Sequence, residues 1–536
     1  MSGLDEALEA WRAAIGEDYV RTDQVTLRQV ETATFATYQE VPALLLPGNR
    51  DEVQRCVRIA NAYKTPLYPV STGKNWGYGS RVPTYNGCVV MSLERLNRIV
   101  DFSEELAYIT VEPGVTFLDV NRFLAERGST LKVNLTGSTY ESSLIGNALE
   151  RGLGSGIYGD RAAHVCDMEV VLPTGEHLRT GFGRFEGAAA SVNRWGVGPS
   201  LDSLFTQSNL GIVTRMTFWL MPISKHRFSC YFATDPDGLE SLIDALHHLR
   251  SSGICNEPIR LYNDYRALSG IVQFPWQAIG AGDFLTPEVM SSIREALGIG
   301  AWLGELHIDA HSPAQARASQ ELVYSSLKGV TNTLYFVDTG GAQWVPMTGN
   351  ATEENGEPFT LQPRPAAEQG RSLETPGGIR NTYWRKRTPV PEKMDPDRDR
   401  CGVLWCAPAV PFIGRHVVRV VRCMEKVILS DRFEPNISLV LLTERCAIVN
   451  AALLYDRDVP GEDDRAMRCY HTLLQELIGM RYLPYRLGIQ SMDSLPASSG
   501  DYDALLARLK KSLDPNDILA PRRYDFRATW PHDMTD

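Results

Sequence analysis

Two glycine-rich stretches contain residue types that can hold a phosphate-bearing ligand. The first, STGKNWGYG at residues 71–79, directly follows an apolar run. Its glycines and small hydroxyl side chains let the backbone approach a ligand closely and point successive N–H groups into one concavity, which suits a pyrophosphate. The second stretch comprises SLIGN at 143–147 and RGLGSGIYGD at 151–160. Two such stretches are what a dinucleotide lying across a sheet requires, although a glycine-rich hairpin and ordinary turns would also explain them.

These loops need a framework of strands and helices, and the sequence between Pro42 and Leu220 predicts one. Short apolar runs alternate there with helical patterns, which is typical of an α/β or α+β domain. Asn49 followed by acidic residues predicts a helix over residues 52–63. The expected strands cover residues 44–46, 67–70, 89–93, 108–111, 168–172 and 212–220. The first glycine-rich loop therefore follows directly from a predicted strand.

The composition changes beyond Met221. Residues 227–326 have the periodicity of ordinary strands and helices, whereas residues 338–400 are rich in Gly, Pro, Thr, Asn and charge. A structureless insertion of this length is uncommon inside a compact domain. We therefore expect residues 338–400 to form either a functional lid or a mobile loop.

Composition and charge limit the classes of function. The chain has 536 residues, of which 43% are hydrophobic and 22% charged, as in ordinary globular proteins. Its formal net charge of -11 repels nucleic acid and anionic lipid surfaces. The ten cysteines form no CxxC pair, the acidic start does not resemble a signal peptide, and no apolar run reaches the roughly 18 residues that span a bilayer. We therefore expect a cytoplasmic protein with reduced thiols and with neither nucleic-acid nor membrane partners.

The segment LHIDAH at residues 306–311 contains potential metal ligands. On a strand, His307, Asp309 and His311 would share one face, and two imidazoles with a carboxylate can bind a metal ion. The Ser-Pro pair that follows is typical of a helix start, which places His311 at a solvated turn. We therefore predict no metal site.

Several segments resemble the FAD-linked oxidoreductases of the vanillyl-alcohol oxidase and p-cresol methylhydroxylase family. They are STGKNWGYG (71–79), TVEPGVTF (110–117), SLIGNALERG (143–152), YGD (158–160), MEVVLPTGEHLRTGFG (168–183), FTQSNLGIVT (205–214) and LDPNDILAP (513–521). The resemblance implies an α+β, two-domain FAD-linked oxidase fold. Residues 1–225, completed by 486–536, would form the FAD-binding domain. Residues 226–485, including the excursion at 338–400, would form a cap over the isoalloxazine ring.

The resemblance also implies FAD as the cofactor, bound by the glycine-rich loops and by the start of a later strand. The residues expected to bind it are Ser71, Thr72, Gly73, Lys74, Asn75, Trp76, Gly77, Ser143, Leu144, Gly146, Asn147, Gly152, Tyr158, Gly159, Asp160, Gly211, Ile212 and Val213.

In this family two tyrosines and an arginine bind a phenolic substrate as its phenolate, and the matching positions are Tyr78, Tyr485 and Arg486. A phenol ionises at about pH 10, so hydroxyl donors and a permanent guanidinium charge are needed to favour the anion at neutral pH. Hydride loss from the benzylic carbon to the flavin then leaves a p-quinone methide. Arg523 matches an arginine that would stabilise the reduced, anionic flavin, although a solvated surface arginine is the alternative.

The chain departs from the family pattern near the flavin. The cap strand that usually carries a histidine for covalent attachment of FAD reads TERCAI at 443–448, so we expect non-covalent FAD, with Tyr383 as the alternative attachment point. The aspartate that the alcohol-oxidase branch carries before SLIGN is replaced by GST at 137–139, and Glu141 is the nearest acid. Without that base, hydroxylation by addition of water to a quinone methide is less expected than oxidation by hydride removal alone. Desaturation of the side chain and oxidation of an existing benzylic alcohol both fit as well.

The sequence is compatible with three interpretations of function. The first is an FAD-dependent oxidoreductase that removes a hydride from an alkylphenol or a 4-hydroxybenzyl alcohol. The second keeps FAD but takes an amino-acid-derived or polyketide phenol of a biosynthetic route, or a non-phenolic alcohol. The third is a catalytically degenerate flavin-fold subunit that scaffolds a partner. The electron acceptor would be molecular oxygen or a cytochrome c, and the resemblance implies a homodimer.

Overall fold

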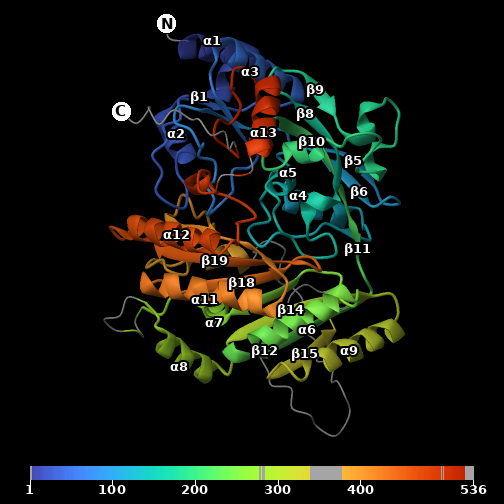
Figure 1. The fold of residues 1–536 in the computed structure, drawn as a ribbon. Helices are drawn as coiled ribbons and strands as arrows, with labels where there is room; N and C mark the ends of the chain where they lie inside the picture. The colour runs from blue at the N-terminus through green and yellow to red at the C-terminus, as the bar shows by residue number, and fades with distance from the viewer. Residues whose placement is uncertain are drawn as a thin grey trace.

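The computed structural model describes residues 3–276, 279, 284–338, 377–496, 498 and 500–524. These residues form helices and sheets in two parts, one above the other in Figure 1. The upper part combines the N-terminal residues with the C-terminal helix α13 (Gly500–Leu513), and the lower part is built on one large sheet. In these ranges no helix is long and apolar enough to cross a membrane.

The upper part begins with a small sheet in the order β1-β2-β4-β3, in which β4 pairs parallel with both β2 and β3. Its strands are β1 (Val20–Arg21), β2 (Leu44–Leu45), β3 (Leu67–Val70) and β4 (Val89–Ser92). The helices beside it are α1 (Gly3–Ile15), α2 (Gln24–Val30) and α3 (Arg50–Tyr63). The side chain of Asn49 accepts the N–H of Glu52 at 2.9 Å, so the predicted start of α3 is confirmed.

An antiparallel sheet in the order β5-β6-β10-β8-β9 completes the upper part. Its strands are β5 (Ile99–Ser103), β6 (Tyr108–Val111), β8 (Val165–Val171), β9 (His177–Arg179) and β10 (Ile212–Trp219). Beside it lie α4 (Phe117–Glu126), α5 (Leu144–Leu149) and the pair β7 (Leu131–Lys132) and β11 (Met221–Pro222). The end of the chain returns to this part, because Leu67 exchanges backbone hydrogen bonds of 2.7 Å with Ile518 and Ala520.

The lower part, which we call the cap, contains an antiparallel sheet in the order β15-β12-β14-β13-β18-β19-β16, with β17 paired to β19. Its strands are β12 (His226–Thr234), β13 (Ile259–Asn263), β14 (Trp302–Ala310), β15 (Thr333–Asp338), β16 (Cys401–Cys406), β17 (Ala409–Pro411), β18 (Asn436–Leu441) and β19 (Cys446–Asp456). Its helices are α6 (Leu239–Ser251), α7 (Asp264–Ile271), α8 (Pro287–Leu297), α9 (Pro313–Leu327), α10 (Gly377–Arg380), α11 (Gly414–Ser430) and α12 (Glu462–Gly479).

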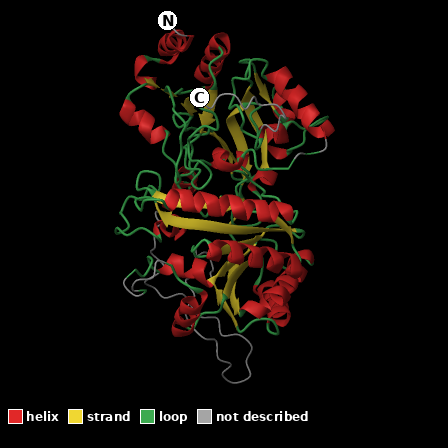
Figure 2. Cartoon of the chain, turned by 60° about the vertical axis from the view of Figure 1, so that its left-hand side comes forward, coloured by secondary structure: helices red, strands yellow, loops and turns green. Residues whose placement is uncertain are grey.

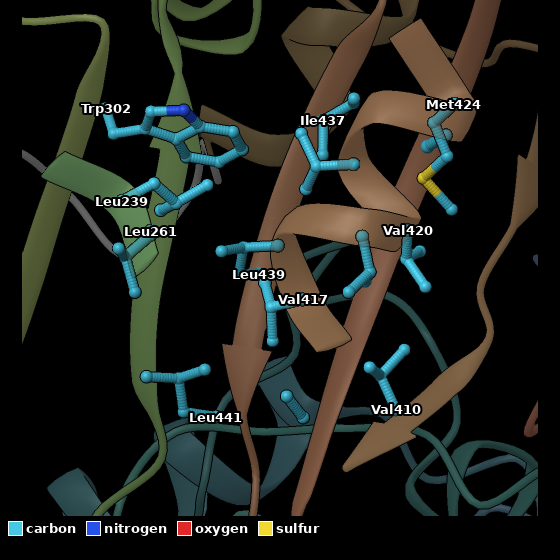
Figure 3. Packing of buried hydrophobic residues seen from close by; sticks show 14 of the residues in the cluster. Leu239, Leu261, Trp302, Val410, Val417, Val420, Met424, Ile437, Leu439 and Leu441 are labelled. Carbon is cyan, nitrogen blue, oxygen red and sulfur yellow. The ribbon is translucent and has the colours of Figure 1, made fainter. Parts of the chain in front are cut away.

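The two faces of the cap sheet have different neighbours. One face packs its apolar side chains against α6, α9, α11 and α12. Figure 2 shows helices lying along the sheet from another side, and Figure 3 shows part of this core, with Leu261, Leu439 and Val417 among the labelled residues. Because side chains alternate along a strand, the intervening Tyr262 and Ser438 point to the opposite face. This second face meets the upper part.

The expected strands are all present, with β8 starting three residues earlier than predicted, whereas β5 and α4 were not predicted. Residues 339–376 of the excursion lie outside the described residues. The described remainder, 377–400, packs into the cap through buried ion pairs. Arg385 contacts Glu434 at 3.1 Å, and Lys386 contacts Asp456 at 2.7 Å.

Candidate functional site

The loop at residues 71–79 forms a concavity into which backbone N–H groups are free to donate. Among the described residues, the backbone N–H groups of residues 72–76 have no hydrogen-bond acceptor. Gly77 has φ of 78°, and a Cβ there would lie 2.1 Å from Cδ1 of Trp405, so only glycine fits. A cavity of about 30 Å³ opens beside Thr72 and Gly73. Free N–H donors in a tight turn fit the diphosphate of a dinucleotide such as FAD.

The second glycine-rich stretch is joined to the first. The N–H of Ser143 donates to the hydroxyl of Thr72 at 3.2 Å, and a Cβ on Gly146 would lie 3.1 Å from Oγ of Ser71. Gly152 packs directly against the side chain of Asn147. The structure therefore brings both predicted loops to one place.

Several predicted cofactor-binding residues use their side chains elsewhere. Lys74 pairs with Glu141, and the Trp76 indole donates to Asp397 at 3.2 Å. Tyr158 stacks on His164 with ring centroids 4.3 Å apart. The buried side chains of three further residues lie in hydrophobic cores, which leaves only their backbones for a ligand: Leu144, Ile212 and Val213. Three further predicted residues lie in tight turns or at the start of a strand: Gly211, Gly159 and Asp160. Gly159 also approaches Pro258 of the cap.

A buried cluster of charges lies beside the loop and contains two of the three predicted phenolate-binding residues. The guanidinium carbon of Arg486 is 4.1 Å from the ring centroid of Tyr78, and Nη2 of Arg486 donates to the side-chain oxygen of Asn75. Nε of Arg486 lies 3.6 Å from Glu150. Glu150 also pairs with Arg523, so one carboxylate connects both arginines.

The predicted surface alternative for Arg523 is wrong, because its side chain is buried and paired. Its Nη1 donates to the hydroxyl of Tyr68 at 2.8 Å, in addition to the contact with Glu150. The hydroxyl of Tyr524 donates to the other oxygen of Glu150 at 3.1 Å. Arg523 therefore belongs to the same cluster as Arg486.

The charges in the cluster determine which protonation states persist. Burial raises the pKa of Glu150, but Arg523 and Arg486 outweigh burial and hold that pKa below its ordinary value. Burial lowers the pKa of Arg486, but Tyr485 and Glu150 outweigh it and raise that pKa. Within the described residues the two guanidiniums share a single carboxylate, so the cluster keeps one uncompensated positive charge.

Tyr485 approaches the cluster from the segment that crosses from the cap to the upper part. Its N–H donates to the carbonyl of Ala407 at 3.1 Å, and its carbonyl accepts from Gln207 at 3.1 Å. Burial raises the pKa of Tyr78 well above its ordinary value, and Tyr485 raises it further because the two hydroxyls are close. Tyr78 is therefore a neutral hydroxyl donor at neutral pH.

The positions considered for covalent attachment and for a base have partners of their own. Tyr383 is buried against Trp76, and its hydroxyl donates to Asp399 at 2.6 Å. Residues 443–445 form the turn before β19, and Glu141 is exposed and paired with Lys74. Asp397, which the sequence analysis missed, accepts from Ser80 at 2.7 Å, and burial raises its pKa to about 7.

His307 and Asp309 share one face of β14 but have separate partners. His307 lies 2.7 Å from the hydroxyl of Ser229, and burial lowers its pKa to about 4. Asp309 pairs with Arg227 at 2.8 Å. His311 is exposed at the end of the strand. Across the described ranges no group of three His, Cys, Asp or Glu side chains is arranged to hold a metal ion.

Sequence reasoning missed Glu150 and Tyr524. Glu150 is the C-cap of α5, where a negative charge interacts unfavourably with the helix dipole. An acid in such an unfavourable position is a signal from which a role for its charge could have been predicted. Tyr524 follows Arg523 directly, but nothing in its immediate sequence predicts that its hydroxyl reaches a residue 374 positions away.

Known proteins similar to this chain are flavoproteins. The family model described as "FAD binding domain" matches residues 41–181. The "1'-carboxy-chondrochloren decarboxylase" of Chondromyces crocatus is 48% identical over 533 residues and is aligned over 98% of each chain. The "4-cresol dehydrogenase (hydroxylating) flavoprotein subunit" of Pseudomonas putida is 30% identical over 97% of this chain and 95% of that protein.

Solved structures agree with this result. p-Cresol methylhydroxylase with bound substrate superposes with a TM-score of 0.84 and 26% identity, over 98% of this chain and 97% of that chain. The 4-ethylphenol oxidase of Gulosibacter chungangensis has the same fold, with a TM-score of 0.85 and 24% identity over 99% and 98% of the two chains.

The fold and the matching family model define an FAD-dependent oxidoreductase built of two parts. The chain belongs to the p-cresol methylhydroxylase and vanillyl-alcohol oxidase family, as the sequence motifs predicted.

Proposed function

We propose that this enzyme removes a hydride from the benzylic carbon of a para-substituted phenol. The observation that carries the proposal is the uncompensated positive charge of the Arg486–Glu150–Arg523 cluster beside Tyr78. A buried net cation favours an anion next to it, and a phenolate is the anion that this oxidation needs.

The side chains have separate tasks in this proposal. Tyr78 and Tyr485 donate hydrogen bonds to the phenolate oxygen, and Arg486 supplies the charge that favours ionisation. Glu150 holds Arg486 and Arg523 in place, and Arg523 stabilises negative charge on the reduced flavin. FAD, when bound, would supply the hydride acceptor. The free N–H groups of residues 72–76 hold its diphosphate.

We further propose that FAD is held non-covalently. The hydroxyl of Tyr383 is engaged by Asp399, and its pKa is raised by burial and by that carboxylate, so it is a poor nucleophile toward the flavin. Acid precipitation of the purified protein should therefore release all flavin into the supernatant. Yellow colour retained in the washed precipitate would contradict this proposal.

A second candidate reaction, oxidative decarboxylation, is favoured by the relative at 48% identity, whose name describes a decarboxylase. If the carbon next to the benzylic carbon carries a carboxylate, hydride removal gives a quinone methide. Loss of CO₂ then moves the C–C bonding pair into a new C=C bond and restores the aromatic phenol. The products are a vinylphenol, CO₂ and reduced flavin, and no base is needed to activate water.

The test is anaerobic reduction of the purified flavoprotein by 4-ethylphenol, followed by the variants Arg486→Ala and Tyr485→Phe. We expect the flavin absorption to bleach in the wild type. Arg486→Ala should lower kcat/KM by about 100-fold or more and Tyr485→Phe by about tenfold, because each removes a hydrogen bond that favours the phenolate over the neutral phenol.

Tyr482→Phe is the matched control, since its hydroxyl contacts His416 inside the cap rather than the site. Unchanged turnover in both site variants would exclude phenolate binding by these residues. Comparing molecular oxygen with an artificial electron acceptor in the same assay identifies the oxidant that the enzyme uses.

A further inference from the structure

Arg266 of α7 is a half-buried cation on the cap face that meets the upper part. Its Nη1 donates to the side-chain oxygen of Asn436 at 3.2 Å. Its guanidinium carbon lies 5.7 Å from the ring centroid of Trp405. Both partners are neutral, so neither compensates the charge.

No carboxylate lies within ion-pair distance of Arg266 among the described residues. Burial lowers its pKa, and the nearby Tyr262 only partly opposes that effect. Other arginines of the cap differ in this respect. Arg227 pairs with Glu257 at 2.6 Å, and Arg294 pairs with Asp264 at 3.0 Å. A partly buried guanidinium without an ion-pair partner among the described residues is one that the anionic group of a bound ligand would stabilise.

Two residues, Trp405 and Gly77, connect Arg266 with the proposed substrate site. Trp405, which lies beside Arg266, packs against Gly77 so closely that a Cβ there would clash with its indole. Gly77 precedes Tyr78, over whose ring Arg486 is stacked. The unpaired cation and the phenolate-binding cluster thus lie on two sides of the same contact between the cap and the upper part.

A row of polar side chains extends across the same face of the cap sheet. Tyr262 pairs in register with Ser438, and Ser438 pairs with Asn450. Two residues further along the same face, Val440 of β18 and Ile448 of β19 pack with Tyr485. One face of the cap sheet therefore connects the neighbourhood of Arg266 with that of Tyr485.

We propose that Arg266 is a specificity-determining residue that binds a carboxylate on the para side chain of the substrate. This inference rests on the phenol oxidation proposed above and narrows its substrate class to phenols whose side chain ends in, or bears, a carboxylate. Arg266 and Arg486 then hold opposite ends of one dianionic molecule, which aligns the benzylic carbon between them. Neutral alkylphenols remain substrates but bind without the second ion pair.

The binding test uses 4-coumarate and its amide, 4-coumaramide, which lack a removable benzylic hydride and differ only in charge. Each is titrated into the oxidised holoenzyme, and the dissociation constant is read from the perturbation of the flavin spectrum. We expect the wild type to prefer the acid. Arg266→Gln should weaken 4-coumarate binding by about 10- to 100-fold and change 4-coumaramide binding less than about twofold.

The turnover test uses 3-(4-hydroxyphenyl)propanoate, its amide and 4-ethylphenol. Arg266→Gln should raise KM for the acid and leave kcat/KM for 4-ethylphenol unchanged, and Arg266→Lys should restore part of the preference because it keeps the charge but not the planar fork. Arg294→Gln is the control, since Asp264 already compensates Arg294. Flavin content and melting temperature of each variant establish that it is folded.

The outcomes separate the two proposals. If the wild type oxidises 4-ethylphenol but binds acid and amide equally, or if Arg266→Gln keeps the preference for the acid, the role of Arg266 is wrong and phenol oxidation stands. If no phenol reduces the flavin of the wild type, phenol oxidation is wrong. A preference for 4-coumarate that depends on Arg266 would then still support carboxylate binding.

Discussion

Glu150 is the residue on which the site's electrostatics depend. It sits at the C-terminal end of α5, where a negative charge is unfavourable for the helix, yet it contacts Arg486, Arg523 and Tyr524. Two buried guanidiniums without it would repel each other and lose their orientation. The contacts of Glu150 with the two arginines offset the unfavourable free energy of a negative charge at this helix end.

We predict that Glu150→Gln lowers the free energy of unfolding by about 3 kcal/mol at pH 7, because it leaves two buried cations uncompensated. The folded-state pKa of Glu150 is lowered, so its contribution is present above the unfolded-state pKa and is lost as pH falls through the folded-state pKa. Urea unfolding at pH 7 and near pH 4 measures the difference. A gap between wild type and variant that does not shrink in acid would contradict this assignment.

At the scale of elements, α3 supports the sheet from which the first glycine-rich loop emerges. Its buried face, which includes Val53 and Val57, packs into the core beneath β3. The helix ends at Lys64, an exposed residue with φ of 51° and ψ of 40°. This left-handed conformation costs an ordinary side chain about 1–2 kcal/mol and is the one that glycine adopts at helix ends.

Lys64→Gly should therefore stabilise the upper part by about 1 kcal/mol, since glycine removes the conformational cost at little loss of contact. Lys64→Ala is the control, because it removes the same charged side chain but keeps the Cβ. Differential scanning fluorimetry should show a higher melting temperature for the glycine variant alone. Equal changes in the melting temperature of both variants would mean that loss of the lysine side chain, and not the backbone conformation, causes the stabilisation.

At the scale of the whole molecule, a short N-terminal segment joins the two parts. Thr34 exchanges hydrogen bonds with Val403 of β16, at 2.9 Å and 3.0 Å, and its hydroxyl also accepts the N–H of Gly77 at 2.9 Å. Phe35, from the same segment, is buried in the hydrophobic core of the cap. The glycine-rich loop and the cap sheet are thus held together by one segment remote from both in sequence.

Phe35→Ala should destabilise the cap by about 3–5 kcal/mol, because it leaves a large cavity in that core. Phe35→Leu, which keeps most of the volume, should cost much less. Urea unfolding followed by far-UV circular dichroism and by flavin fluorescence measures both effects. If Phe35→Ala unfolds at the wild-type urea concentration, the segment does not anchor the cap.

Arg522, near the end of the described residues, lies in a left-handed turn. Its φ is 67°, the conformation that glycine favours, so the arginine at this position carries backbone strain.

The sequence by itself determined the features that depend on neighbouring residues. Apolar runs predicted the strands, and Asn49 with the acidic residues after it predicted a helix to within two residues of where α3 begins. The resemblance of several motifs to a known family implied the flavin cofactor. Local periodicity and turn chemistry act over a few residues, so they can be recognised in one chain.

Only the tertiary structure decided which charges meet. The side chain of Arg523 contacts Glu150, 373 residues earlier, and that of Arg486 contacts Asn75, 411 residues earlier, whereas Arg266 meets no acid among the described residues. Such pairings depend on how two sheets and a returning C-terminus pack, and no short-range pattern encodes them. The packing of the cap against the upper part therefore set the charge of the site. It determined which ions were buried together and which guanidinium had no acid beside it among the described residues.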